Sequence, residues 1–468
     1  MIDMSEVFAI DLGDLVDDVA GPVALPGDER YAAEGFAWNL GFPQRPAVAV
    51  GATSAQDVQA AVRFAADRDL PVAVVSTGHG VLGTADGAVL INVRRLRDVV
   101  VDERARTATV GAGVEWQEVV AAAGKHGLAP LSGSSPNVGV VGYTLGGGLS
   151  PVLGRRYGWA ADHVRSLELV TPDGELRTVT ADSEPDLFWA VRGGKSNFGV
   201  VVSMTFGLVP VARFYGGGLY FDAVHAPELL EEFRRLATRD DDDLSVSVAF
   251  LRMPAAPFVP EPLRGRVIVH VRFSYLGSAE RGAELAAPLR AVAPALIDVL
   301  REMPYTDQAL VHSDPVDPMP AYERTALLTT FPPEAAEALV GAVGADARTD
   351  VIVVELRRLG GALSRPPQID SAAGYHDAGF NLWVGTSGEP GRPEQAAASL
   401  DAVIAAMAPW LDPRTLINFM GAADADPERI AGAYQPEAYE RLLRLKRTYD
   451  PQNLFRVNHV LRADRVGN

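Results

Sequence analysis

A histidine flanked by two glycines is the residue in this chain best placed for chemistry. In the run PVAVVSTGHG, residues 71–80, the apolar residues 72–75 predict a short buried strand, and Gly78, His79 and Gly80 predict a sharply turned loop after it. Glycine permits φ > 0 and lets a ligand approach the main chain, and successive N–H groups in such a turn bind anions. The loop therefore predicts a phosphate site with one imidazole beside it. A surface turn with a solvated histidine is the alternative.

Two further glycine-rich stretches indicate backbone that lies close to something else. The first, LSGSSPNVGVVGYTLGGG at 131–148, is more apolar than a linker. The second, RGGKSNFG at 192–199, runs into a predicted strand at 200–206. Glycine at this density in a folded chain marks repeated turns or close contact with a ligand.

The elements around these loops alternate between strand and helix. Strands are expected at 47–50 and 72–75, on either side of a helix that Thr53 or Ser54 caps and that ends near Arg68. Further strands are expected at 88–93, 99–102, 107–110, 164–170 and 176–179, and further helices at 115–125 and 186–191. This order predicts an α+β fold.

The pattern changes near residue 208. Alternating strands, such as 244–250 and 267–273, are then separated by Pro-rich turns and Ala-rich helices. This predicts a second domain, an antiparallel sheet covered by helices on one face. An amphipathic helix is expected at 439–447.

Composition restricts the class of protein. The chain has 468 residues, 48% hydrophobic and 22% charged, which is ordinary for a globular protein of two or three domains. Its net charge of −18 argues against a nucleic-acid partner. The absence of cysteine excludes disulfides, thiolate metal sites and thiol nucleophiles. Because we find no secretory signal and no run of about eighteen apolar residues, we expect a cytoplasmic protein without a membrane span.

Several common motifs are incomplete. Gly111 and Gly113 begin a dinucleotide fingerprint, but Trp116 stands where the third glycine is needed. Residues 194–196 resemble the end of a P-loop, but Trp189 stands where its first glycine belongs. No Gly-x-Ser-x-Gly elbow is present and the eight histidines show no metal-ligand spacing, so serine-hydrolase and metal chemistry are not expected.

The ordered set of motifs resembles one known family. The STGHG loop, the stretch ending in LGGG, the RGGKSNFG turn, ELRRLGGALSR at 355–365 and YDPQNLFRVNH at 449–459 are similar, in this order, to the berberine-bridge-enzyme-like FAD-linked oxidases. These belong to the vanillyl-alcohol-oxidase, or PCMH-type FAD-binding, superfamily. The resemblance covers nearly the whole chain. It implies a two-part FAD-binding domain, 1–207 plus a returning segment 430–468, and a substrate-binding domain at 208–429.

The resemblance implies a covalent bond from His79 to the C8α methyl group of the flavin. It also implies cofactor contacts from residues within the matching motifs: Ser76, Thr77, Gly78, Gly80, Ser135, Gly139, Gly142, Tyr143, Gly199, Val201, Asn418, Phe455 and Asn458. In many relatives a cysteine attaches the flavin a second time. Ser135 stands at that place here, so we expect one covalent link, through His79 only.

The residue that takes the substrate proton departs from the family pattern. Relatives often carry a catalytic tyrosine in a Tyr-x-Asn-Tyr segment, but the matching stretch here is LINF at 416–419. We expect Glu355, on a predicted strand at 351–356 with apolar neighbours, to replace it, because desolvation would raise its pKa toward the range of a general base. Pairing of Glu355 with Arg357 or Arg358 on a solvated face is the alternative.

Tyr143 and Tyr375 are further catalytic candidates in the pocket wall, with packing as core aromatics the alternative for each.

The chain is closest in character to singly linked bacterial polyketide-tailoring flavoenzymes. The resemblance implies an oxidase for a hydroxylated or polyketide-like secondary metabolite, free or bound to a carrier protein, with O2 as the electron acceptor. An oxygenase or oxidative cyclase acting on a β-ketone, and a flavin-fold binding protein without turnover, are the alternatives. No metal, nucleic-acid or membrane partner is expected, and the oligomeric state stays open, with a homodimer as one option.

Overall fold

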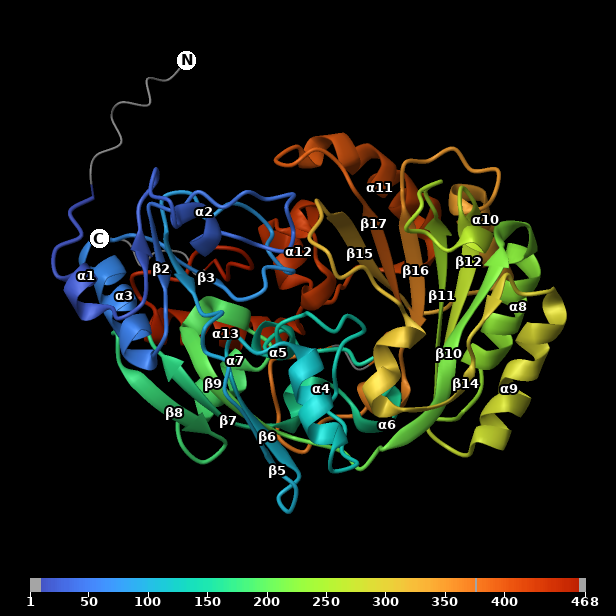
Figure 1. Ribbon diagram of the computed structural model, residues 1–468, viewed down its shortest axis with the longest axis horizontal. Coiled ribbons are helices and arrows are strands. Elements are labelled where there is room, and N and C mark those ends of the chain that lie inside the picture. The colour runs from blue at the N-terminus through green and yellow to red at the C-terminus, as the bar shows by residue number, and fades with distance from the viewer. Residues whose placement is uncertain (1–9, 375–376, 463–468) are drawn as a thin grey trace.

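The computed structural model describes residues 10–374 and 377–462. The described chain forms two lobes, one built on a four-stranded and a five-stranded sheet and the other on a nine-stranded sheet (Figure 1). Helices accompany all three sheets, which confirms the α+β class. Among the described residues, no helix is long and apolar enough to cross a membrane.

The four-stranded sheet carries the His79 loop. Its strands lie in the order β1 (Val23–Ala24), β2 (Val48–Gly51), β4 (Val89–Asn92) and β3 (Val72–Val75), and the last three are parallel. Helix α3 (Ala55–Asp67) connects β2 to β3, and the Ser54 side chain caps it by accepting a hydrogen bond from the Asp57 N–H. Residues 76–80 therefore emerge at the carboxyl edge of a parallel sheet. Two short helices, α1 (Leu15–Asp18) and α2 (Tyr31–Glu34), precede β2.

The five-stranded sheet is antiparallel. Its order is β5 (Val99–Asp102), β6 (Thr107–Gly111), β9 (Val200–Gly207), β7 (Val164–Val170) and β8 (Leu176–Thr180). The connections contain α4 (Trp116–Gly124), α5 (Val140–Thr144), α6 (Gly154–Tyr157) and α7 (Pro185–Val191). Helix α5 lies inside the glycine-rich stretch, where composition predicts no helix. It forms because Val140 and Val141 are buried in the core, and tertiary packing outweighs weak local propensity.

The nine-stranded sheet separates an apolar face from a polar one. Its order is β13 (Ile297–Asp298), β10 (Arg213–Asp222), β12 (Val267–Tyr275), β11 (Leu244–Arg252), β16 (Val353–Arg358), β17 (Phe380–Thr386), β15 (Tyr322–Leu328) and β18 (Leu411–Asp412), with β14 (Arg301–Pro304) beside β10. The apolar face packs against α8 (Ala226–Ala237), α9 (Ala279–Val292), α10 (Pro333–Val343) and α11 (Pro393–Met407).

The polar face of this sheet looks toward the first lobe. Ser247, Arg272 and Arg357 stand opposite one another on three neighbouring strands, so they share that face. Together with Leu149 and Ser150 of the first lobe, they line a small pocket between the lobes. The period-two alternation of the strands thus supplies one face for the core and one for a site.

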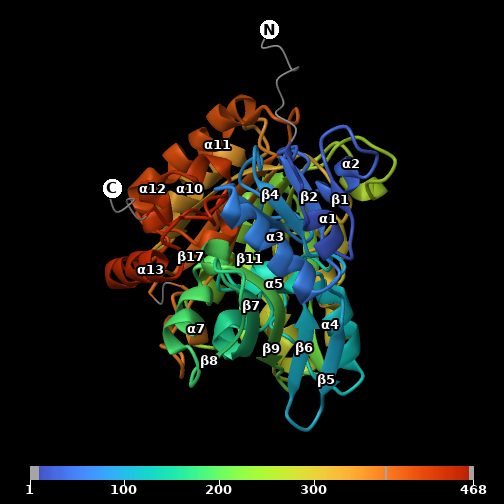
Figure 2. The same cartoon turned by 90° about the vertical axis from the view of Figure 1, so that its left-hand side faces the viewer.

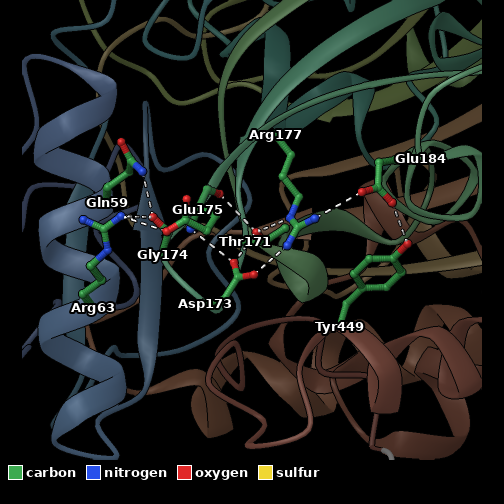
Figure 3. A network of polar contacts seen from close by, with 9 residues as sticks. All are labelled: Gln59, Arg63, Thr171, Asp173, Gly174, Glu175, Arg177, Glu184 and Tyr449. Carbon is green, nitrogen blue, oxygen red and sulfur yellow. Dashed lines mark hydrogen bonds and ion pairs between the residues drawn. The ribbon is translucent and has the colours of Figure 1, made fainter.

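The C-terminal segment returns to the first lobe. After α12 (Pro427–Ala431), helix α13 (Pro436–Tyr449) packs beside α7 (Figures 1 and 2). The Tyr449 hydroxyl donates a hydrogen bond to Glu184 Oε2 (3.2 Å), and Arg177 joins Glu184 to Asp173 in the β7–β8 turn (Figure 3). The Gly174 carbonyl of that turn accepts hydrogen bonds from side chains of α3. This network links α13 to both sheets of the first lobe.

Candidate cofactor and substrate site

The His79 imidazole is held beyond the end of β3 by two contacts. Its Nδ1 lies 2.8 Å from Thr77 Oγ1, and its ring stacks on Trp38 with 4.4 Å between centroids. Gly78 has a φ of +79°, and a Cβ at this position would approach Ala37 Cα to 2.5 Å. The turn therefore requires glycine, and it presents the imidazole in one orientation.

Burial decides the chemistry of this imidazole. It lowers the His79 pKa to about 4, and the nearby Asn137 side chain opposes the shift only in part. The ring is therefore neutral at neutral pH, and a neutral ring nitrogen is the nucleophilic form. His79 Nε2 and Ser76 Oγ are buried without a hydrogen-bond partner in the described chain. Two such atoms on one loop indicate a ligand that contacts them.

Ser135, one of the predicted cofactor contacts, lies in the same neighbourhood. Its Oγ donates to Asn137 Oδ1 (2.8 Å), and Asn137 Nδ2 donates to the Val316 carbonyl (2.7 Å). Trp38 Nε1 donates to the same carbonyl (2.9 Å). The loop before β15 therefore joins the second lobe to the surroundings of His79.

The second predicted cofactor stretch passes beside the His79 loop. The Gly139 N–H donates to Thr77 Oγ1 (3.3 Å) where α5 begins. A Cβ at Gly142 or at Gly80 would meet no heavy atom within 4 Å. Both positions therefore leave bare backbone beside open space, as a cofactor-binding segment needs.

Tyr143 is packed between glycines. Cβ atoms at Gly133 and Gly148 would approach its ring to 3.0 and 2.6 Å, and Trp116 meets the ring edge-on. Burial raises the Tyr143 pKa well above its usual value, so the phenol keeps its proton at neutral pH. Its hydroxyl can donate a hydrogen bond but is unsuited to accept a substrate proton. Tyr375 lies outside the described residues.

Asn418 connects α5 to a residue that the sequence reasoning missed. From the short 3-10 helix η9 (Ile417–Phe419), Asn418 Nδ2 donates to the Tyr143 carbonyl (2.7 Å). Asn418 Oδ1 accepts from Lys195 Nζ (2.5 Å), which also donates to the Gly142 carbonyl (3.3 Å). The only signal for Lys195 in the sequence was a lysine within a glycine turn.

The predicted tail residues lie against β3 and the segment after His79. The Leu454 carbonyl accepts a hydrogen bond from the Val72 N–H (2.9 Å), and Asn458 Oδ1 accepts one from the Leu82 N–H (3.3 Å). Phe455, which lies between Leu454 and Asn458 in the sequence, is buried. The structure therefore brings His79 and the tail to one edge of the four-stranded sheet.

Gly199 and Val201, two of the predicted cofactor contacts, are packed against the five-stranded sheet. A Cβ at Gly199 would lie 2.3 Å from the Val170 carbonyl, and its φ is +148°. Val201 is buried and pairs with Leu169 of β7. The atoms nearest to a Gly199 Cβ and the strand partner of Val201 belong to β7 of the five-stranded sheet.

Glu355 forms the centre of a buried charge cluster on the polar face of the large sheet. Arg272 and Arg357 each approach Glu355 Oε2, to 2.8 and 2.9 Å, and Ser247 Oγ donates to Oε1 (2.6 Å). His312 Nε2 lies 3.4 Å from Oε1. All five side chains are buried.

The expected rise of the Glu355 pKa is wrong. Burial alone would raise it, but Arg272, Arg357 and His312 together hold it well below its usual range. The pairing with Arg357 considered as the alternative is present, although the face is buried and not solvated. A carboxylate stabilised in this way is a poor general base, so the cluster is better suited to bind and orient than to take a proton.

A second carboxyl on the same face has the opposite property. Burial, with a smaller contribution from Asp424, raises the Glu323 pKa to about 7, although Trp383 Nε1 donates to its Oε2 at 2.6 Å. Trp383 stands opposite Glu355 across β16 and β17. Glu323 therefore exchanges its proton near neutral pH. Sequence reasoning missed it because its environment depends on strands that are distant in the chain.

Comparisons with known proteins agree with this arrangement. Residues 46–180 match the family model described as FAD binding domain, and residues 418–462 match the one described as berberine and berberine like. The chain is 28% identical over 459 residues to (R)-6-hydroxynicotine oxidase of Paenarthrobacter nicotinovorans, covering 94% of this chain and 96% of the relative. It is also 28% identical to the FAD-linked oxidoreductase OXR1 of Pyricularia oryzae, covering 94% and 88%.

Solved structures show the same architecture. A crystal structure of 6-hydroxy-D-nicotine oxidase from Arthrobacter nicotinovorans superposes with a TM-score of 0.80 at 26% identity, covering 95% of this chain and 98% of that one. Xylooligosaccharide oxidase from Myceliophthora thermophila superposes with a TM-score of 0.81 at 21% identity, covering 97% and 99%, a likeness of fold alone. The relatives thus match both lobes and the returning tail.

Proposed function

Because the chain belongs to the FAD-linked oxidoreductases with a berberine-like C-terminal segment, we propose that it is an oxidase with one FAD attached through His79 alone. Its substrate is a small hydroxylated or polyketide-like metabolite, and O2 is the electron acceptor. Residues 1–207 and 430–468 form the FAD domain, and 208–429 form the substrate domain. The observation that carries the proposal is the half-buried, neutral imidazole whose Nε2 atom is buried and has no hydrogen-bond partner in the described chain.

The residues present fit FAD. Ser76 Oγ and His79 Nε2 offer unpartnered polar atoms, and Gly80 and Gly142 offer open backbone. When bound, FAD accepts a hydride from a substrate carbon and passes the electrons to an oxidant. Thr77 occupies Nδ1 of the imidazole, which leaves Nε2 as the nitrogen for the covalent bond. With no cysteine in the chain, a second thioether attachment is excluded.

The charge cluster supports a substrate site on the polar sheet face. Arg272 and Arg357 present guanidinium groups at the pocket between the lobes, and Glu355 holds both in place. Guanidinium groups in a buried site orient substrate oxygen atoms. They also stabilise an enolate, and this observation favours the second candidate, an oxygenase or oxidative cyclase acting on a β-ketone.

The mass of the denatured protein tests the cofactor and its link. The purified chain should carry the added mass of one FAD, and His79→Ala should lose it, because no other residue forms the bond. His126→Ala, at an exposed histidine, is the control and should keep the full mass. Covalent flavin that persists in His79→Ala would contradict the assignment.

Reaction with substrates tests the activity. Candidate β-diketones, hydroxynicotine and xylobiose should be added to the protein without oxygen, and a true substrate should bleach the flavin absorbance. Recovery of the colour in air indicates an oxidase. Incorporation of labelled oxygen into the product indicates the oxygenase alternative.

A further inference from the structure

A half-buried lysine beside the proposed cofactor site has no acidic partner among the described residues. Lys195 begins the short 3-10 helix η3 (Lys195–Phe198), and its Nζ contacts two neutral oxygens, Asn418 Oδ1 and the Gly142 carbonyl. In the described chain, no ion pair joins this ammonium to a carboxylate, and burial alone lowers its pKa to about 8. A cation partly removed from water without a counter-ion is unfavourable, so such a group commonly faces an anion.

Lys446, which is buried, shows the contrast. Lys446 lies 2.6 Å from Asp450 Oδ2 and donates to two main-chain carbonyls, so its charge is neutralised within the protein. The titratable neighbour of Lys195 is His459, whose pKa is held well below its usual value by burial and by the Lys195 charge. His459 is therefore neutral, and an imidazole supplies no negative charge to the ammonium in either protonation state.

The position of the Lys195 ammonium is fixed by its surroundings. The residue adopts a φ of +55°, uncommon outside glycine, and its N–H donates to the Leu145 carbonyl (3.3 Å). Asn418 is itself held by the Tyr143 carbonyl. The ammonium thus lies among Gly142 and Asn418, two of the residues proposed to contact FAD.

We propose that Lys195 supplies the fixed positive charge that stabilises the negative charge acquired by the flavin ring of bound FAD on reduction. The inference rests on the proposed function. A hydride brings two electrons and one proton to the neutral oxidised ring, so the reduced ring carries one negative charge. A preorganised cation in a site shielded from water favours that state and raises the reduction potential.

The test compares Lys195→Met with the wild-type holoenzyme. Two quantities are measured without oxygen: the midpoint potential against reference dyes, and the dissociation constant of sulfite, which adds to oxidised flavin and leaves a negative charge on the ring. In Lys195→Met we expect a lower potential and sulfite binding weakened by at least about tenfold, with unchanged covalent flavin content. Lys195→Arg should restore both, and Lys125→Met, at an exposed lysine, should match the wild type.

A second variant guards against misfolding of the first. Asn418→Asp places a carboxylate beside the ammonium and should also lower the potential and weaken sulfite binding. An unchanged potential in both variants, with a sulfite dissociation constant within about twofold of the wild type, would overturn the inference while leaving the proposed function intact. If the variants incorporate FAD poorly but the bound flavin has a normal potential, the Lys195 ammonium contacts the pyrophosphate and not the flavin ring. This outcome would also overturn the inference. Wild-type protein without FAD would instead contradict the proposed function itself.

Discussion

Glu323 and Glu355 lie on the same face of the nine-stranded sheet, but their pKa values are shifted in opposite directions. Two guanidinium groups keep Glu355 ionised, whereas Glu323 has an indole N–H as its donor and a pKa raised to about 7. Near neutral pH, the proton that this face can exchange therefore belongs to Glu323. Any pH dependence of activity in that range should be sought at Glu323 before Glu355.

Glu323→Gln should change the pH dependence of stability. Between pH 4.5 and about 7 the folded protein keeps a proton on Glu323 that the unfolded chain has released, so this group lowers the free energy of unfolding as pH rises. The variant should therefore be more stable than the wild type by about 3 kcal/mol at pH 8 and equal to it near pH 4. Urea unfolding at several pH values measures this. The exposed Glu337→Gln is the control, and a pH-independent difference would contradict the prediction.

The parts of the site that are local in sequence could be predicted, and the parts that depend on distant strands could not. The His79 loop follows a strand at 72–75, as its apolar run and glycines predict. The direction of the Glu355 pKa could not be read from apolar neighbours, because Arg272 reaches it from another strand. Lys195 shows the same limit, since Asn418 and Gly142 meet it only in the fold.

Helix α13 holds the C-terminal tail beside β3 through one buried ion pair. Lys446 Nζ bonds the Asp450 carboxylate and the carbonyls of Asn197 and Phe455. Asp450 in turn accepts hydrogen bonds from the N–H groups of Leu454 and Phe455. One ion pair thus fixes the end of the helix, the turn after it and the start of the tail.

Lys446→Met should release the tail. Breaking a buried ion pair leaves the Asp450 charge unpaired, which typically costs about 3–5 kcal/mol of stability. We expect reduced stability and lower covalent flavin content, measured by denaturant unfolding and intact mass. Arg447→Met, at the adjacent exposed position, should change neither. Full flavin content in Lys446→Met would show that the cofactor does not need the docked tail.

Element boundaries followed the strength of their patterns. The strands at 99–102 and 164–170 are where the sequence predicts them, because a valine run marks the first and the Thr-Pro-Asp-Gly turn at 171–174 ends the second. The two-residue strands β1, β13 and β18 were not expected, since such short segments carry no periodicity and pair only because a sheet edge is nearby.

The whole molecule places the proposed cofactor site where several separate segments meet. The His79 loop, α5, the loop before β15, η9 and the tail are linked by hydrogen bonds around it. A ligand that contacts all of them should stabilise the assembly, because it binds only the folded arrangement.

Free FAD should therefore stabilise His79→Ala. By mass action, FAD at about one hundred times its dissociation constant adds about 2.7 kcal/mol to the free energy of unfolding. The melting temperature should rise with FAD concentration, and riboflavin, which lacks the pyrophosphate, should have a smaller effect. A melting temperature that does not respond to FAD would mean that His79→Ala retains no FAD site.

The docking of the tail also sets the order of events during synthesis. Strand β3 and the residues at 450–460 that cover it are separated in the gene by the entire second lobe. A nascent chain therefore exposes the uncovered edge of β3 while the ribosome translates that lobe. Because Leu454 bonds β3 only once the tail has been made, we expect FAD to bind after translation has passed the tail, and not to bind unfinished polypeptides.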